Sequence, residues 1–323
     1  LVRERRLVPR VAPLRIAGWP WPFRVATLGR FELLRAGAPV EFSGKGPGRP
    51  MELLKVLVAL GGQNVRADHL GDALWPHVDA DYAHKSFTAT LHRLRRLLGD
   101  DEALQLRDGR LSLGAGLVWV DAWALESVLA EFDEVLRDPP GESRIAALQR
   151  LVDEAFALYR GPFLPDESEQ PAYLAYREQN RARLLRCLAR VARACEEAGR
   201  PEAGADGYQR MIDADPAYAP AYAGLADCYN QLGTVFIGER SPSETRPRAV
   251  AAARKALEID SQLAEAHAAL AYDDLYNWNW QQAEHGFKRA IELNPSYASA
   301  HLWFAHYLSV RGRFPEALQE VYF

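Results

Sequence analysis

The chain has 323 residues, of which 48% are hydrophobic and 25% charged, and this balance excludes a mostly disordered chain and a collagen-like one. No run approaches eighteen consecutive apolar residues, which excludes a membrane-spanning helix, and three cysteines in so long a chain favour a reducing compartment over a disulfide framework. The net charge of −4 is unevenly distributed: residues 1–116 contain 18 Lys+Arg and 12 Asp+Glu, whereas residues 117–323 contain 21 and 31, so only the front part is suited to binding a polyanion.

Residues 1–22 contain four prolines and scattered arginines without periodicity, which predicts a linker that arrives from an upstream segment. The chain begins with Leu1, and the arginines that follow do not precede an apolar stretch, so no signal peptide is visible. We therefore expect a cytoplasmic protein that is a piece of a longer one.

Short strands are predicted next, because Val25, Thr27, Phe31 and Leu33 occupy alternate positions. A turn at 36–39 then leads into a further strand at 40–42. From residue 51 the period becomes helical, and this first helix stops at Gly61-Gly62.

Two more helices and a hairpin follow. The second helix is expected at about 67–75, before Pro76. The third starts near Asp81, directs four apolar side chains to one side and ends at Gly99; those side chains are Phe87, Leu91, Leu94 and Leu98. An Asp108-Gly109 pair between alternating leucines predicts a hairpin over 104–113.

Strands, three helices and a hairpin in this order are the layout of a winged helix-turn-helix. The segment 91–98 (LHRLRRLL), in this setting, resembles the OmpR/PhoB-type winged helix. Residues 118–123 (VWVDAW) and 161–165 (GPFLP), which flank a helix expected at 143–160, are similar to the bacterial transcriptional activator domain. Together they resemble the SARP-like bacterial regulators, which implies a winged-helix DNA-binding domain at 23–116 followed by an activator-type helical domain at 117–215.

The last part of the chain, 216–323, repeats. The small residues Ala249, Ala283 and Ala317 begin similar patterns 34 residues apart, and Ala283 is followed by Phe287 and Ala290 at the tetratricopeptide spacing. An earlier copy begins 45 residues before Ala249, which indicates an insertion near 233–247. We expect tetratricopeptide hairpins, with the final copy truncated, and therefore a mainly α fold.

The third helix carries the candidate DNA-binding face. Opposite its apolar side lie residues that can bond to phosphates and to base edges, and the B-form major groove admits one helix. The candidates are Tyr82, Lys85, Thr88, His92, Arg93 and Arg96. At the hairpin tip, Arg107 and Arg110 are expected to reach phosphate or the minor groove, as the wing of such a domain. An ordinary solvated surface is the alternative for both elements.

The sequence gives little support for nucleotide binding, metal binding or catalysis. Residues 44–49 (GKGPGR) lack the order of a phosphate-binding loop, and a basic turn near the DNA backbone is the better interpretation. No histidine or cysteine spacing suits a metal, and no spacing suggests a nucleophile with its base. We therefore expect neither an enzyme nor a cofactor or metal site.

The sequence thus predicts a transcriptional regulator whose winged helix binds double-stranded promoter DNA. The helical remainder would form a homo-oligomer, sense an effector protein or contact RNA polymerase. The alternative function is a tetratricopeptide interaction scaffold whose winged helix does not bind DNA.

Overall fold

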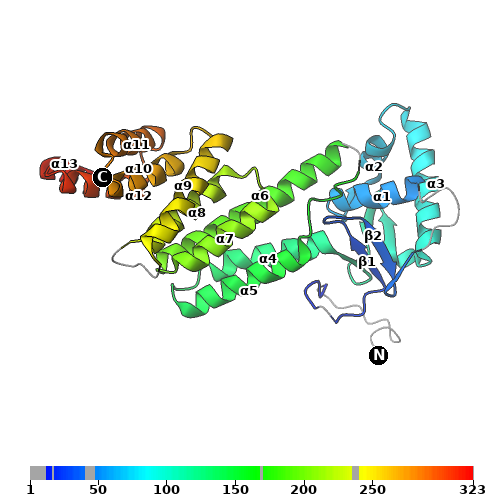
Figure 1. The fold of residues 1–323 in the computed structure, drawn as a ribbon. Helices are drawn as coiled ribbons and strands as arrows, with labels where there is room; N and C mark the ends of the chain where they lie inside the picture. Colours follow the sequence, from blue (N-terminus) through cyan, green and yellow to red (C-terminus); the bar gives the residue numbers. More distant parts are fainter. Residues whose placement is uncertain (1–11, 17, 41–47, 168–169, 235–239, 323) are drawn as a thin grey trace. The chain divides into compact units, whose positions relative to one another are not determined.

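The computed structural model describes residues 12–16, 18–40, 48–167, 170–234 and 240–322 (Figure 1). It divides into two compact units, which we call unit 1 (residues 1–137 and 149–184) and unit 2 (138–148 and 185–323). The fold is mainly helical, with two small sheets near the start of the chain and a helical hairpin array at its end, as predicted.

Unit 1 begins with a four-stranded sheet of order β3-β2-β1-β7. Its strands are β1 (Phe23–Ala26), β2 (Glu32–Arg35), β3 (Ala38–Pro39) and β7 (Val118–Val120). β1 and β2 pair antiparallel, as the alternation predicts, whereas β7 pairs with β1 in parallel. The third strand begins at Ala38, earlier than the expected 40–42, because the turn occupies only Ala36 and Gly37, both with positive φ. Residues 41 and 42 lie outside the described residues.

Three helices and a second sheet form the winged-helix part. The helices are α1 (Gly48–Ala59), α2 (Ala67–Leu74) and α3 (Ala80–Leu98), and the sheet, of order β4-β6-β5, contains β4 (Val65–Arg66), β5 (Leu104–Arg107) and β6 (Arg110–Leu113). The single-turn helix η1 (Asp101–Ala103) joins α3 to β5. These bounds confirm the predicted helices and hairpin to within about three residues.

Both ends of α3 are fixed by local chemistry. The Asp79 side chain accepts a hydrogen bond from the Tyr82 backbone N–H at 2.8 Å, which caps the start of the helix. Gly99 ends it in the left-handed conformation with φ 69°. Arg95 donates to the Leu104 carbonyl at 2.9 and 3.1 Å and so ties the last turn of α3 to the hairpin.

Helix α4 (Asp121–Val135) is joined to the first sheet through the buried carboxylate of Asp121. That carboxylate accepts hydrogen bonds from the Thr27 N–H and hydroxyl and from the Leu28 N–H, at 2.6 to 2.9 Å. Gly62, with φ 69°, lies directly against the Trp123 ring of α4. The activator-type segment thus begins within the core of unit 1.

The GPFLP segment packs on the same region of unit 1. The Leu164 N–H donates to the Thr27 carbonyl at 2.8 Å, and Phe163 forms a bridge to Leu28. The Phe163 ring contacts Tyr173 and Tyr176 edge-on. This motif therefore has a structural role, which is to fasten the chain between α5 (Glu142–Leu158) and α6 (Pro171–Glu197) to the β1–β2 turn.

The described residues 12–16 and 18–22 have no helix or strand but are not free of contacts. The Trp119 indole donates to the Leu14 carbonyl at 2.9 Å, and Arg15 pairs with Glu131 and Glu154. Trp21 is buried. This part of the segment before β1 is therefore packed onto unit 1.

Unit 2 is an array of helical hairpins. Its helices are α7 (Pro201–Ala214), α8 (Ala219–Leu232), α9 (Pro242–Ile259), α10 (Ala264–Tyr276), α11 (Trp280–Leu293), α12 (Ala298–Val310) and α13 (Phe314–Val321). The repeat alanines Ala249, Ala283 and Ala317 are all buried, each on the second helix of a hairpin. Pro242 and Pro247, expected in the insertion, instead belong to α9, and residues 235–239 lie outside the described residues.

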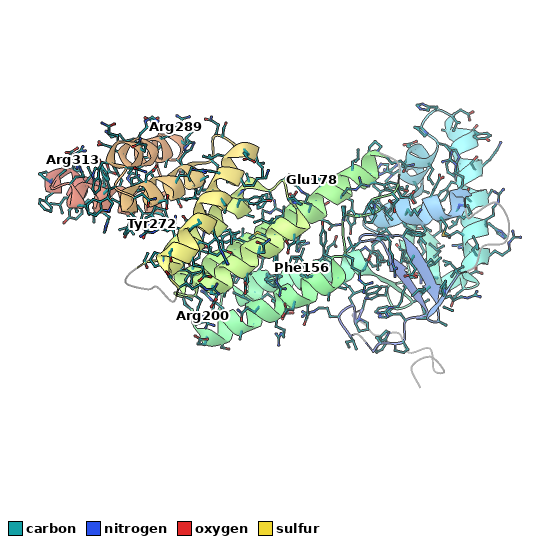
Figure 2. All side chains as sticks on the ribbon, viewed as in Figure 1. Phe156, Glu178, Arg200, Tyr272, Arg289 and Arg313 are labelled. Atoms are coloured by element: carbon teal, nitrogen blue, oxygen red, sulfur yellow. The ribbon has the colours of Figure 1, made fainter. Side chains whose placement is uncertain are left out.

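Aromatic rings fill the space between neighbouring hairpins. Tyr272 of α10, labelled in Figure 2, lies 4.8 Å from Trp303 of α12 between ring centroids. Phe287 of α11 contacts Phe304 and Tyr307. Cys187 and Cys195, on α6, are buried as expected. Among the described residues, none of the helices combines the length and apolar character that crossing a membrane would require.

Candidate nucleic-acid interface

The six candidate residues on α3 all lie on its exposed side. Ala83, Phe87, Leu91, Leu94 and Leu98 are buried against the rest of the winged-helix part, so the opposite side chains face outward. Those are Tyr82, Lys85, Thr88, His92, Arg93 and Arg96. The apolar period of the sequence therefore identifies the side of α3 that faces solvent. The contact of these six residues with DNA stays a prediction.

The cations of this face are not used by the fold of unit 1. Within the described residues of that unit, Lys85, Arg93 and Arg96 have no ion pair. Arg95, in contrast, is turned to the Leu104 carbonyl. The Thr88 hydroxyl donates to the His84 carbonyl at 3.0 Å and keeps its acceptor capacity.

The hairpin between β5 and β6 has the geometry of a tight, rigid wing. Asp108 and Gly109 have φ of 48° and 69°, as a type I′ turn requires at both central positions. Arg107 and Arg110 face each other across this turn, and both are exposed. The Gly109 carbonyl accepts from the Ala67 N–H at 2.9 Å, which fixes the tip to the start of α2.

We expect the wing arginines to contribute electrostatic affinity. In the double variant Arg107→Ala, Arg110→Ala, the slope of log K against log salt for DNA binding should become shallower by about 0.9 for each phosphate neutralised by an arginine in the parent. Fluorescence anisotropy of a labelled duplex over a salt series measures it. The matched control is the double variant Arg248→Ala, Arg289→Ala in unit 2. A slope equal to that of the parent would show that the wing does not touch DNA.

Two basic segments near α3, at Arg66 and at residues 44–49, are less available for binding DNA. Arg66 is held by Asp68, and this pairing keeps the pKa of the Asp68 carboxyl well below its usual range. Gly44 to Pro47 of the expected basic turn lie outside the described residues. Arg49 bonds to Glu52 at 2.7 Å and to the Leu74 carbonyl at 3.0 Å, which is a structural role.

His84 is a further candidate on α3, which the sequence did not predict. It lies in the second turn of α3 and is exposed beside Lys85 and Thr88. In helix-turn-helix proteins the first turns of the recognition helix contact base edges, so its position, not its residue type, is the signal. The candidate face of α3 was defined as the side opposite its apolar residues, and this definition omits His84 at the edge of that side.

Comparison with known proteins adds the following. Residues 120–236 match the family model described as the bacterial transcriptional activator domain. No curated protein matches the chain. The solved structure of Mycobacterium tuberculosis EmbR, in complex with a low affinity phosphopeptide, is similar with a TM-score of 0.52 and 21% identity, over 74% of this chain and 60% of that chain.

The likeness to EmbR is one of fold, and this chain spans about 60% of the length of that protein. A thermophilic TPR protein of Thermus thermophilus is similar with a TM-score of 0.41 and 16% identity, over 61% of this chain and 87% of that chain.

Proposed function

We propose that this chain, which carries a bacterial transcriptional activator domain at residues 120–236, is a DNA-binding transcriptional regulator that reads the major groove of promoter DNA with α3. The observation that carries the proposal is the exposed side of α3, whose cations have no ion pair among the described residues of unit 1, next to a tight hairpin with two arginines at its tip. We place the DNA-binding part at residues 23–116.

The residue types suit two kinds of contact. Lys85 and His92, near the middle of the exposed side, can bond to base edges in the groove, and a bidentate or well-placed contact gives discrimination between bases. Arg93 and Arg96, further along the helix, are suited to the phosphates that fix the register of the helix. Tyr82 and Thr88 add hydroxyl groups at the start of the face.

The scaffold alternative predicts different partners for the cations of α3. If the winged helix packed on protein, Lys85, Arg93 and Arg96 would be expected to pair with carboxylates. Within the described residues of unit 1 they have no ion pair, so the fold leaves them open to the phosphates of DNA. For the helical remainder we propose self-association, effector sensing or contact with RNA polymerase.

The test is site selection from random duplexes with the whole chain, followed by affinity measurements on the selected site. Lys85→Ala and His92→Ala should each weaken specific binding by about 1–3 kcal/mol, and should weaken binding to random duplex much less. Lys288→Ala in unit 2 is the matched control. Equal affinity of parent and variants for the selected site, with circular dichroism unchanged, would refute the assignment of α3.

A further inference from the structure

Unit 2 contains a cavity of about 710 Å³, within the size range of small-molecule sites. Its walls come from four helices, α6, α7, α8 and α10, and from the residues that open α12. Gly224 of α8 lies against the Tyr208 ring of α7, since a Cβ at this glycine would come within 2.2 Å of the ring. This close approach leaves the tyrosine as part of the cavity wall.

The charge of the cavity wall is strongly unbalanced. Four carboxylic side chains line it, and the only cation among the described lining residues is Arg193, which is exposed. The carboxylic residues are Glu196, Glu197, Asp227 and Glu265. A concave surface of this kind attracts a positive charge, because the field of several like charges adds within a low-dielectric wall.

The Asp227 side chain is a second, independent observation at this cavity. Its side chain is only 8% exposed, and its Oδ2 accepts a hydrogen bond from the Tyr297 hydroxyl at 2.9 Å. Its Oδ1 is buried and has no hydrogen-bond partner among the described residues. Buried polar atoms in native proteins are almost always satisfied, so this oxygen is suited to accept a hydrogen bond from a ligand.

The groups around Asp227 disfavour the charged form of its side chain. Burial raises the pKa of the Asp227 carboxyl well above its usual range, and the nearby carboxyl of Glu196 raises it further, as does that of Glu265. Glu196 itself accepts a weak hydrogen bond from the Cys228 thiol at 3.7 Å. Burial among these carboxyls therefore disfavours the carboxylate form of Asp227, which a cationic ligand would stabilise.

The shape of the cluster favours an organic cation over a metal ion. No group of three His, Cys, Asp or Glu side chains among the described residues converges closely enough to hold a metal. The wall also includes the rings of Tyr208 and Tyr297. Carboxyl groups combined with aromatic faces are suited to guanidinium and ammonium groups, which bond to the former and are attracted by the latter.

We propose that this cavity binds the cationic head of an organic ligand, a guanidinium or primary ammonium group on a short aliphatic or peptide chain. The Asp227 carboxylate is the central contact, and Glu196 and Glu265 lie beside it. The ligand head donates to the unpartnered Oδ1 while Tyr297 continues to donate to Oδ2. The inference goes beyond DNA binding and does not depend on it.

Isothermal titration calorimetry of the whole chain, without DNA, tests the proposal. The probes are n-butylguanidinium and n-butylammonium, with n-butanol and butanoate as neutral and anionic controls of the same chain length. We expect at least one of the two cations to bind, and neither control to bind. Asp227→Asn keeps the shape of the side chain and should weaken cation binding by about tenfold or more, since it removes a charge-assisted hydrogen bond.

Two further variants keep the result interpretable if Asp227→Asn disturbs the fold. Glu265→Gln should also weaken binding, because it removes a charge from the half-buried cavity wall. Asp206→Asn makes the same chemical change at an exposed site of α7 outside the cavity and should leave the affinity within about twofold, as surface charges are weak contributors. Cation binding that survives both cavity variants, or no preference for cations over the neutral control, would overturn the proposal.

A second set of titrations with peptides tests whether the cation belongs to a polypeptide or to a small molecule. A capped Gly-Gly-Arg-Gly-Gly peptide is compared with its glutamine-centred counterpart and with n-butylguanidinium. Tighter binding of the arginine peptide identifies a polypeptide partner, and tighter binding of the free compound identifies a small molecule; both support a cation site. Failure of the DNA-binding tests would leave this result unaffected, because no step of it involves α3 or the wing.

Discussion

Replacing Asp121 by alanine is expected to destabilise unit 1 by about 3–5 kcal/mol, because several buried donors lose their acceptor at once. The carboxylate accepts hydrogen bonds from four donor groups, which are the Thr27 N–H and hydroxyl and the N–H groups of Leu28 and Ala122. Thr27 is itself fully buried, so its donors cannot turn to water. Each buried donor left without a partner costs about 1–3 kcal/mol.

Amide hydrogen exchange resolved by segment is the appropriate measurement, because a chain of two units does not unfold in a single step. We expect the amides of β1 and of α4 to lose protection in Asp121→Ala. The control, Asp72→Ala, removes an exposed carboxylate from α2 and should leave them unchanged. Protection of β1 equal to that of the parent would mean that the GPFLP segment and sheet pairing hold the β1–β2 turn without Asp121.

The elements that the sequence predicted well are those defined by neighbours in the chain. Helix α3 follows from its apolar period, its cap from Asp79 and its end from Gly99, all within one segment. The wing follows from the Asp108-Gly109 pair, and the hairpin array from a 34-residue period. The recognition of the bacterial transcriptional activator domain rested on short motifs and was confirmed by the family match at 120–236.

What escaped prediction depends on contacts between distant segments. The parallel pairing of β1 with β7 joins residues 23–25 to 118–120, and no local pattern encodes that register. Pro247 lies inside α9, where tertiary packing outweighs the one helix hydrogen bond that the proline removes. From the sequence alone an aspartate is expected to be exposed to solvent, whereas Asp121 and Asp227 are buried.

The sequence does contain a signal for the buried position of Asp227. It lies in a helix whose other inward positions are small or apolar, and Asn230 follows three residues later. Two polar residues on the buried side of an otherwise apolar helix indicate either a hydrogen-bonded network or a ligand. Only the structure separates these, because it shows that the Tyr297 hydroxyl reaches one carboxyl oxygen and that the other has no partner among the described residues.

The buried carboxyl of Asp227 makes the stability of unit 2 depend on pH. The ordinary pKa of aspartate is about 4 in an unfolded chain, and burial raises the pKa of Asp227 in the folded protein, where nearby carboxyls add to the effect. Between these two values the folded state holds a proton that the unfolded state has released. The free energy of unfolding therefore falls as the pH rises through this window.

Asp227→Asn should remove that pH dependence, because the amide does not titrate and keeps nearly the same shape. We expect the variant and parent to be equally stable near about pH 4, where the aspartate begins to titrate in the unfolded chain. The variant should become more stable than the parent as the pH rises, by about 1–3 kcal/mol at the upper end of the window. The titratable groups that face Asp227 stay in place in the variant, and the interaction of their charges with the Asp227 carboxylate is part of the measured difference; they are Arg193, Glu196, Tyr208, Cys228, Glu265 and Tyr297.

Amide exchange of α8 and α10, followed from about pH 5 to about pH 8 and corrected for intrinsic rates, measures the difference. A stability difference that stays constant with pH would show that the Asp227 carboxylate is already ionised without added ligand. In that case a cation from the chain, such as Arg193, must satisfy it in solution. A guanidinium ligand that binds the parent should reduce the difference, because it stabilises the same carboxylate whose burial is otherwise unfavourable.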